Sequence, residues 1–386
     1  FTAVAGEGYF INTTGGAVSV NLPAGTAGAV VAVKDYAGTF DTNAVTLVQN
    51  GSDKIGGSTV NATLDVEGIA VTLVFIDSTQ GWLVTDSGLQ SEAPTAQYIC
   101  ASSPSVATVG DFKIHTFTGP GTFTVNSVGN AGGSNTVDYL VIGGGGSGAW
   151  DGGGGAGAGG YRFSNGTASG SYCAGPAPLG ASALPVSVQG YPITVGAGGS
   201  PITSNTISNP GANSIFSTIT AAGGGRGARI GQPIPHPGDG GSGGGVRGGS
   251  GQGSGNTPPV SPPQGNDGNT GPGNGGGGGG AGAAGTVGGG PSSPGGAGGV
   301  GLTSNITNTP TVRGGGGGGG ADNPSVSGGA GGSGGGGTGG TRPSTAKGGD
   351  GTANTGGGGG GTGVPGSSGT GAGGSGIVII RYKFQN

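Results

Sequence analysis

Few residues of this chain could support metal, thiol or acid–base chemistry, and those few lie far apart. The 386 residues include two histidines, His115 and His236, and two cysteines, Cys100 and Cys173. A zinc site needs three or four His, Cys or carboxylate ligands held together, and the sequence has no such spacing. The cysteines match no redox motif, so we expect two isolated thiols and no bound metal.

The carboxylates do not form the pair that glycoside hydrolysis requires, which is two carboxyl groups a few Å apart. Acidic residues in the second half of the chain occur singly and far apart, at Asp138, Asp151, Asp239, Asp267, Asp322 and Asp350. We interpret them as solvated loop carboxylates. The sequence therefore predicts no catalytic residues and no enzymatic activity.

Glycine motifs that bind nucleotides need a structural frame, which is missing here. Gly-x-Gly-x-x-Gly recurs by chance at this composition, without the strand, helix and downstream acid of a dinucleotide site. No Gly-Lys-Ser or Gly-Lys-Thr occurs. We therefore expect no cofactor and no nucleic-acid partner. No apolar run approaches the roughly 18 residues of a membrane span, so we expect no membrane insertion.

Composition divides the chain into two parts. Of the 109 glycines, 19 lie in residues 1–141 and 90 in residues 142–386. Net charge divides nearby, at −8 for residues 1–111 and +4 for residues 112–386. A weakly positive second half favours anionic partners such as acidic surface polysaccharide, although so dilute a field steers association rather than specifying it. The chain lacks Met and begins at Phe1, from which we expect a removed initiator or a fragment of something longer.

The first part reads as an all-β domain over residues 1–90. Short runs with period-two alternation occur at 17–22, 29–34, 45–49, 70–76 and 82–85, separated by Gly, Pro and Asn turns. Small and polar residues with two prolines then predict a connector over residues 91–111. We expect six to eight strands in the domain and no α-helix.

The remainder, residues 112–386, is predicted to be a glycine-rich domain framed by a few strands. A hairpin is expected over 112–128, then a strand over 137–142 and a closing strand over 376–384. Between them lie glycine runs, the longest at 314–320. Collagen is excluded because it needs glycine at every third position with Pro between.

Glycine runs can build a fold only through their backbone. An extended three-fold helix of the polyproline II kind rises about 3.1 Å per residue and leaves its N–H and C=O groups without internal partners. Without a Cβ, neighbouring backbones can approach closely enough to pair. We therefore predict a bundle of packed polyglycine II helices, with structural glycines at Gly144, Gly277, Gly317 and Gly358.

Several blocks of the second part resemble the glycine-rich domain of bacteriophage tail fibres and adhesins. These blocks are 138–146, 159–162, 193–199, 219–225 and 374–382, in that order. The resemblance implies sandwiched polyglycine II helices with receptor contacts in loops at one end. The first part is similar to β-domains of marine phage fibre and virion-structure proteins at 6–10, 34–38 and 77–84.

Loops where Arg, aromatic and stiff residues coincide are the expected binding sites, because such groups carry most interface energy. Ten residues qualify: Arg226, Arg229, Ile230, Ile234, His236, Arg313, Arg342, Lys347, Trp150 and Tyr172. The competing interpretation of each is an ordinary solvated loop residue.

The leading hypothesis is a tail-fibre or adhesin component of a virion, acting outside the cell. It would bind a host-cell surface receptor, protein or polysaccharide, through loops between glycine runs. The other partners would be fibre and virion proteins, and we expect a homo-oligomer, a trimer, formed through the first domain because exposed sheet edges need protection. The alternatives are a self-assembling extracellular filament subunit without a receptor and, more remotely, an ice-binding protein.

Overall fold

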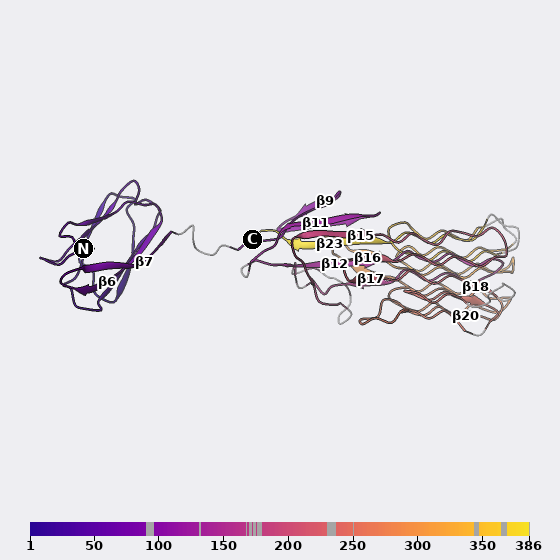
Figure 1. Ribbon diagram of the computed structural model, residues 1–386. Coiled ribbons are helices and arrows are strands. Elements are labelled where there is room, and N and C mark those ends of the chain that lie inside the picture. Colours follow the sequence, from indigo (N-terminus) through magenta and orange to yellow (C-terminus); the bar gives the residue numbers. More distant parts are fainter. Residues whose placement is uncertain are drawn as a thin grey trace. The chain divides into compact units, whose positions relative to one another are not determined.

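The computed structural model describes residues 1–89, 96–130, 133–166, 168–169, 172, 175, 180–229, 237–249, 251–342, 347–363 and 369–385. Its regular elements are all β-strands, and the described residues contain no α-helix, which confirms the expected fold class. The chain forms two compact units, Phe1–Thr95 and Ala96–Asn386 (Figure 1).

The first unit packs two sheets around an ordinary apolar core. One sheet has the order β1-β3-β6-β7 and the other β2-β4-β5. Val31, Val33, Leu73 and Trp82 are among the buried side chains between them. Four of the five predicted runs begin and end within a residue or two of a strand, but the last strand is longer, and the sequence interpretation missed β1 and β5. The strands are β1 Glu7–Ile11, β2 Val18–Asn21, β3 Val30–Asp35, β4 Val45–Val48, β5 Ala62–Leu64, β6 Ile69–Asp77 and β7 Gly81–Leu89.

The second unit begins with a β-sandwich. One sheet has the order β13-β12-β23-β10-β9, with β14 paired to β12, and the other has the order β17-β16-β15-β11-β8. An aromatic core that includes Phe123, Phe216 and Tyr382 lies between them. Its strands are β8 Cys100–Ser102, β9 Val106–Val109, β10 Phe112–Phe117, β11 Gly121–Ser127, β12 Thr136–Ile142, β13 Tyr161–Phe163, β14 Leu184–Pro185, β15 Gln189–Thr194, β16 Ser214–Phe216, β17 Ile219–Ala221 and β23 Ile377–Lys383.

Strands β12 and β23 are mostly apolar and almost wholly buried because both faces of their sheet are covered. Their side chains alternate between the aromatic core and a second cluster, which contains Leu140, Ile142 and Ile379. The two strands pair antiparallel from Asp138↔Arg381 to Ile142↔Ile377. The predicted closing strand over 376–384 is thus β23, in the middle of the sheet.

Two sequence expectations differ from the structure. The predicted hairpin over 112–128 does not form, because β10 pairs with β9 and β23 while β11 pairs with β8 and β15. The C-terminal strand β23 lies beside β10 in one sheet, whereas β11 belongs to the opposite sheet. The predicted connector, 91–111, also reaches too far, because β8 and β9 are paired strands of the second unit.

Beyond the sandwich the glycine runs lie side by side (Figure 1), and run 314–320 shows how they bond. Its N–H groups donate in a repeating cycle of three directions. Gly316 and Gly319 donate to the carbonyls of Gly299 and Gly296, and Gly315 and Gly318 to those of Gly334 and Gly337. Because the same neighbour recurs every third residue, the run has three residues per turn, as the polyglycine II prediction requires.

The third direction and the acceptors complete the surroundings of this run. Gly317 and Gly320 donate to segment 153–156, while the run's carbonyls accept bonds from segments 275–281, 329–332 and 358–361. Six segments therefore surround run 314–320, and each is held by backbone hydrogen bonds. A Cβ at any position from 315 to 320 would overlap a carbonyl oxygen of a neighbouring segment, which explains why this run is unbroken glycine.

Outer runs follow a different sequence rule. Segment 327–333 carries Ser327, Ala330 and Ser333 at every third position, and all three are exposed, while the glycines between them are more buried. Thr194, Ala197 and Ser200 repeat the pattern in another segment. One third of an outer run faces solvent, and only that third can carry a side chain.

Shorter strands border the glycine runs. Two of them, β21 Leu302–Ser304 and β22 Thr311–Arg313, form a hairpin. The others, β18 Ala228–Arg229, β19 Val246–Arg247 and β20 Thr270–Gly271, form a parallel ribbon of three strands.

His115 lies buried in the sandwich on β10. Its Nδ1 is 2.7 Å from Ser103 Oγ, and its Nε2 is 3.2 Å from the Tyr382 hydroxyl. Burial, with a smaller contribution from the charge of Lys113, lowers the pKa of His115 to about 4. The imidazole is therefore neutral at pH 7, and both of its ring nitrogens have polar partners within the sandwich.

We predict that Gly317→Val destabilises the second unit by a few kcal/mol, whereas Ala330→Val has a small effect. A Cβ on Gly317 would overlap the Gly359 carbonyl oxygen, which separates the runs and breaks bonds of about 0.5 to 1.5 kcal/mol each. Ala330 already carries an exposed Cβ in an outer run. Thermal melts of both variants, with Ser325→Val as a turn control, test this. Equal melting temperatures for all three would contradict a bundle built from glycine.

We also predict that the second unit loses stability as pH falls from about 6.5 to about 4. Over that window His115 takes up a proton in the unfolded chain but not in the folded one, whose pKa is about 4. The shift corresponds to roughly 3 kcal/mol when integrated. Denaturation of wild type and His115→Phe at several pH values measures it. A wild-type profile as flat as that of the variant would refute the assignment.

Candidate functional site: the far end of the glycine runs

Five charged side chains from five separate ends of runs and short strands gather where the glycine runs end, away from the sandwich. Figure 1 places β18 and β20 at this end, and β12 and β23 at the other. We call it the far end. The five are Asp151 after run 143–148, Arg229 at the end of β18, Arg247 at the end of β19, Asp322 after run 314–320, and Arg342 after segment 335–341.

Ion pairs join these side chains. Arg229 pairs with Asp151. Arg247 donates from Nη2 to Asp322 Oδ2 at 2.7 Å and from Nη1 to the Asp151 carbonyl at 2.7 Å. Arg342 Nη1 reaches the other oxygen of Asp322 at 3.2 Å. Four of the five side chains are 16–27% exposed, and only Arg342 is half exposed.

The backbone fixes the two carboxylates. Asp151 occupies the left-handed region with φ 55°, which aspartate tolerates better than most residues, and this conformation turns the chain back into segment 153–160. The Asp322 N–H donates to Asn274 Oδ1 at 2.8 Å, and Asn274 is buried with its amide bonded to Gly290 and Ser293. Both acids therefore sit on rigid supports.

Two surface hollows adjoin the ion pairs. The first, about 310 Å³, is lined by Asp151, Arg229, Arg247, Gly248 and Asp322. The second, about 260 Å³, is lined by Arg247, Pro272, Gly273, Asn274, Pro291, Asp322 and Asn323. The Arg247–Asp322 pair lines both hollows.

The structure brings only some of the predicted binding residues together. Arg229 and Arg342 lie in the far-end network. Lys347 pairs with Asp350 Oδ1 at 2.7 Å, and Arg226 is half-buried along a run. Ile230, Ile234 and His236 lie outside the described residues, as does Cys173, while Cys100 is an exposed free thiol.

Three predicted binding residues are not exposed loop residues. Arg313 lies in β22, is 9% exposed, and burial lowers its pKa; the seven-residue run 314–320 separates it from the far end by about 20 Å. Trp150 is 5% exposed. The ring of Tyr172 stacks on Arg381 at 4.8 Å, and burial raises its pKa. The side chains of Arg313, Trp150 and Tyr172 therefore pack within the fold.

The four predicted structural glycines all lie in buried runs. A Cβ on Gly144, Gly277, Gly317 or Gly358 would overlap a backbone carbonyl of a neighbouring run. Their contribution to stability stays a prediction until the substitution is measured.

Sequence reasoning missed Asp151, Arg247 and Asp322. One signal could have found them, since each charge follows the last glycine of a run by two or three positions. The interpretation of the acids as solvated was wrong for Asp138, which is buried and accepts bonds from Ser164 Oγ and Ser169 Oγ at 2.6 Å.

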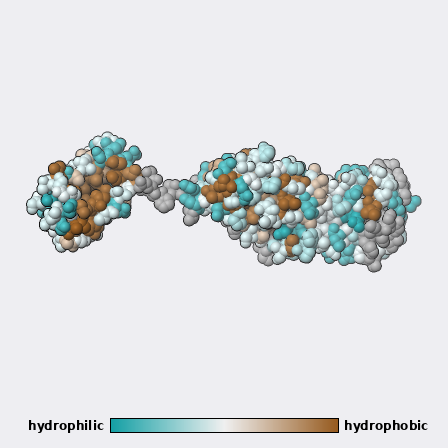
Figure 2. All heavy atoms as spheres, in the orientation of Figure 1, coloured by the Kyte–Doolittle hydropathy of each residue, from teal (hydrophilic) through white to brown (hydrophobic). Residues whose placement is uncertain are grey.

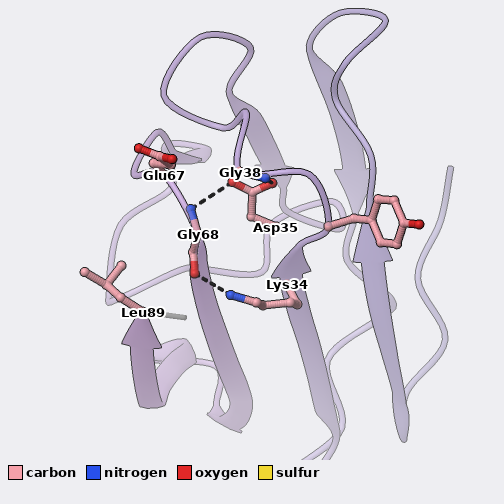
Figure 3. Close-up of a pocket in the computed structure, with 7 residues that line it drawn as sticks. Lys34, Asp35, Gly38, Glu67, Gly68 and Leu89 are labelled. Atoms are coloured by element: carbon pink, nitrogen blue, oxygen red, sulfur yellow. Dashed lines mark hydrogen bonds between the residues drawn. The ribbon is translucent and has the colours of Figure 1, made fainter. Parts of the chain in front are cut away.

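A further hollow, about 510 Å³, lies in the first unit and was not predicted (Figure 3). Its lining residues include Lys34, whose ammonium donates to the Gly68 carbonyl, and Asp35. Burial raises the pKa of Asp35, but four backbone N–H donors, from Gly38, Thr39, Phe40 and Gly68, outweigh it and lower the pKa overall. Asp35 is therefore a fixed anion that shapes the loop after β3.

Within the described residues, no three His, Cys, Asp or Glu side chains lie close enough together to hold a metal ion. A search of the same residues finds no helix with the length and apolar character to cross a membrane.

Comparisons with known families agree with the division into two units. A family described as a glycine-rich domain matches residues 117–383. The N-terminal family of bacteriophage T4 gp9/10-like proteins matches residues 1–89. The resemblance of the first part to phage structural proteins is thereby confirmed, as is the assignment of the second part to a glycine-rich domain family.

One curated relative is the baseplate wedge protein gp10 of Enterobacteria phage T4. It is 39% identical over 77 residues, which are 19% of this chain and 13% of that protein. The chain thus matches only a small part of this relative's length, at a level that supports common ancestry of the aligned region.

Proposed function

This chain belongs to the glycine-rich domain family, and we propose that it is a bacteriophage tail-fibre or adhesin component that binds a host-cell receptor. The observation that carries the proposal is that the two ends of the second unit differ. The sandwich, which contains its first strand β8 and its last strand β23, lies at one end of the runs. Charged turns from distant parts of the sequence gather at the other end.

The bundle suits a rigid presenter of loops. Its runs are fixed by backbone bonds in several directions, so turn sequences can change without altering the scaffold. The role we propose is not enzymatic, because the described far-end carboxylates are engaged by arginines. Glycosidases instead hold two carboxyl groups with separate acid and base roles.

The first unit supplies the second half of the proposal, which is attachment to other virion proteins and self-association as a trimer. Its match to a phage structural family points to a place in the virion, outside the host cell. In the four-stranded sheet Val30, Val74 and Leu83 are cross-strand neighbours on the face turned away from the core. Figure 2 shows brown apolar atoms gathered over one face of this unit, and such surfaces mark interaction sites.

We predict that far-end turns determine host binding. Replacing residues 230–236 by a neutral segment of equal length leaves the backbone bond between Gly238 N–H and the Arg226 carbonyl in place. The variant should fold and lose or alter adsorption of the full chain to host cells. The control exchanges exposed residues of the β21–β22 turn, with Asn308→Gly and Thr309→Ser. Unchanged adsorption after exchange of every far-end turn would reject the adhesin proposal.

We predict that residues 1–95 form a trimer through the exposed apolar face. Phe10 is 76% and Ile76 44% exposed on strands of this sheet, and burying such side chains stabilises association. Light scattering at high micromolar concentration should give three times the monomer mass, and Phe10→Ser with Ile76→Ser should lower it. A strictly monomeric wild type would contradict self-association.

A further inference from the structure

We propose that the two far-end hollows are adjacent subsites for a neutral oligosaccharide, one sugar ring in each. This inference rests on the proposed attachment function, because it names the chemistry of the receptor. The first hollow, at about 310 Å³, lies at the lower end of the roughly 300 to 1,000 Å³ range of ligand sites, and the second, at about 260 Å³, lies just below it. Each suits a single ring better than a folded protein segment.

Charge compensation decides between a neutral and an acidic ligand. The first hollow is lined by two arginines and two aspartates, and the described contacts pair each guanidinium with a carboxylate. Arg342 also pairs with Asp322 and leaves the cluster with one positive charge in excess, but it is not among the described residues that line either hollow. An anion in the first hollow would therefore meet a lining of balanced charge and would approach two carboxylates. The net positive charge of the second part of the chain therefore does not set the local preference.

The same pairs suit hydroxyl groups. A guanidinium has five N–H donors, and each carboxylate oxygen can accept more than one bond. The described contacts of Arg247 use its two terminal nitrogens once each, to the Asp151 carbonyl and to Asp322. Donors and acceptors thus remain side by side, and neighbouring hydroxyls of a sugar can donate to one and accept from the other.

The lining residues that the two hollows share are the reason for proposing one ligand with two sugar rings. Arg247 and Asp322 line both hollows, so a ligand bound in both passes directly over this pair. In the second hollow, Pro272 and Pro291 offer apolar ring surfaces to the C–H face of a sugar. Asn323 is held by donation from Nδ2 to the Pro291 carbonyl at 2.6 Å.

A protein receptor is the competing occupant. Protein interfaces concentrate their energy in aromatic and arginine anchors buried in apolar pockets. The described linings of the two hollows contain no aromatic side chain, and Trp150, close by in sequence, is buried. The rigid supports of Asp151 and Asp322 also reduce the entropy lost on binding a small ligand.

The experiment measures binding of the full chain to arrayed neutral di- and trisaccharides and to acidic ones carrying uronic or sialic acid. We expect binding to at least one neutral oligosaccharide, and its loss after periodate opens the vicinal diols. Arg247→Gln and Asp322→Asn should each weaken binding at least tenfold. Arg162→Gln, a matched change on β13 in the sandwich, should leave it unchanged. Thermal melts check that each variant folds. If Arg247→Gln unfolds, the binding measured with Asp322→Asn, which keeps the side-chain shape, tests the inference.

Three outcomes would overturn the inference: binding only to acidic glycans, binding to no glycan, or wild-type affinity in the folded Asp322→Asn variant. Adsorption to host cells separates this failure from failure of the proposed function. Adsorption that resists periodate but is abolished by protease treatment of the cells would reject the saccharide and keep the adhesin. Adsorption indifferent to every far-end exchange would reject the adhesin itself.

Discussion

The hydrogen bond between the backbones of neighbouring glycine runs is the interaction on which the second unit depends. A run with three residues per turn points its N–H groups in three directions, so its bonds join several neighbours at once. Close approach of the backbones is the condition for these bonds, and a Cβ would prevent it. The composition of the chain follows, with glycine at most interior positions, a few small buried side chains such as Ala156 and Ala158, and side chains at every third position of the outer runs.

The two units are thus stabilised by different physical means. In the first, Val31, Leu73 and Trp82 are buried between two sheets, and removal of apolar surface from water supplies the driving force. In the bundle there is little side-chain surface to bury, and glycine loses much conformational freedom on folding. Stability there comes from many backbone bonds, and the sandwich closed by β23 anchors the bundle through side-chain packing at one end.

This division has a consequence for function. Since interior runs admit only small side chains such as Ala156 and Ser147, larger polar and charged groups are confined to the turns and to the exposed third of the outer runs. The far end collects the charged residues Asp151, Arg247 and Asp322, whose positions are fixed by the ends of different runs. The bundle therefore brings residues that are far apart in sequence together on one compact and rigid polar surface.

The sequence by itself determined the all-β class, most strands of the first unit and the three-residue repeat, because these depend on local alternation and on the absence of a Cβ. It also indicated Arg229 and Arg342 as turn residues. Only the tertiary structure decided that β10 pairs with β23 and not with β11, that Arg313 is buried, and that Arg247 and Asp322 meet. Runs of identical glycines carry no information about which run lies beside which, so neighbours across the bundle are set by the packing of the whole unit.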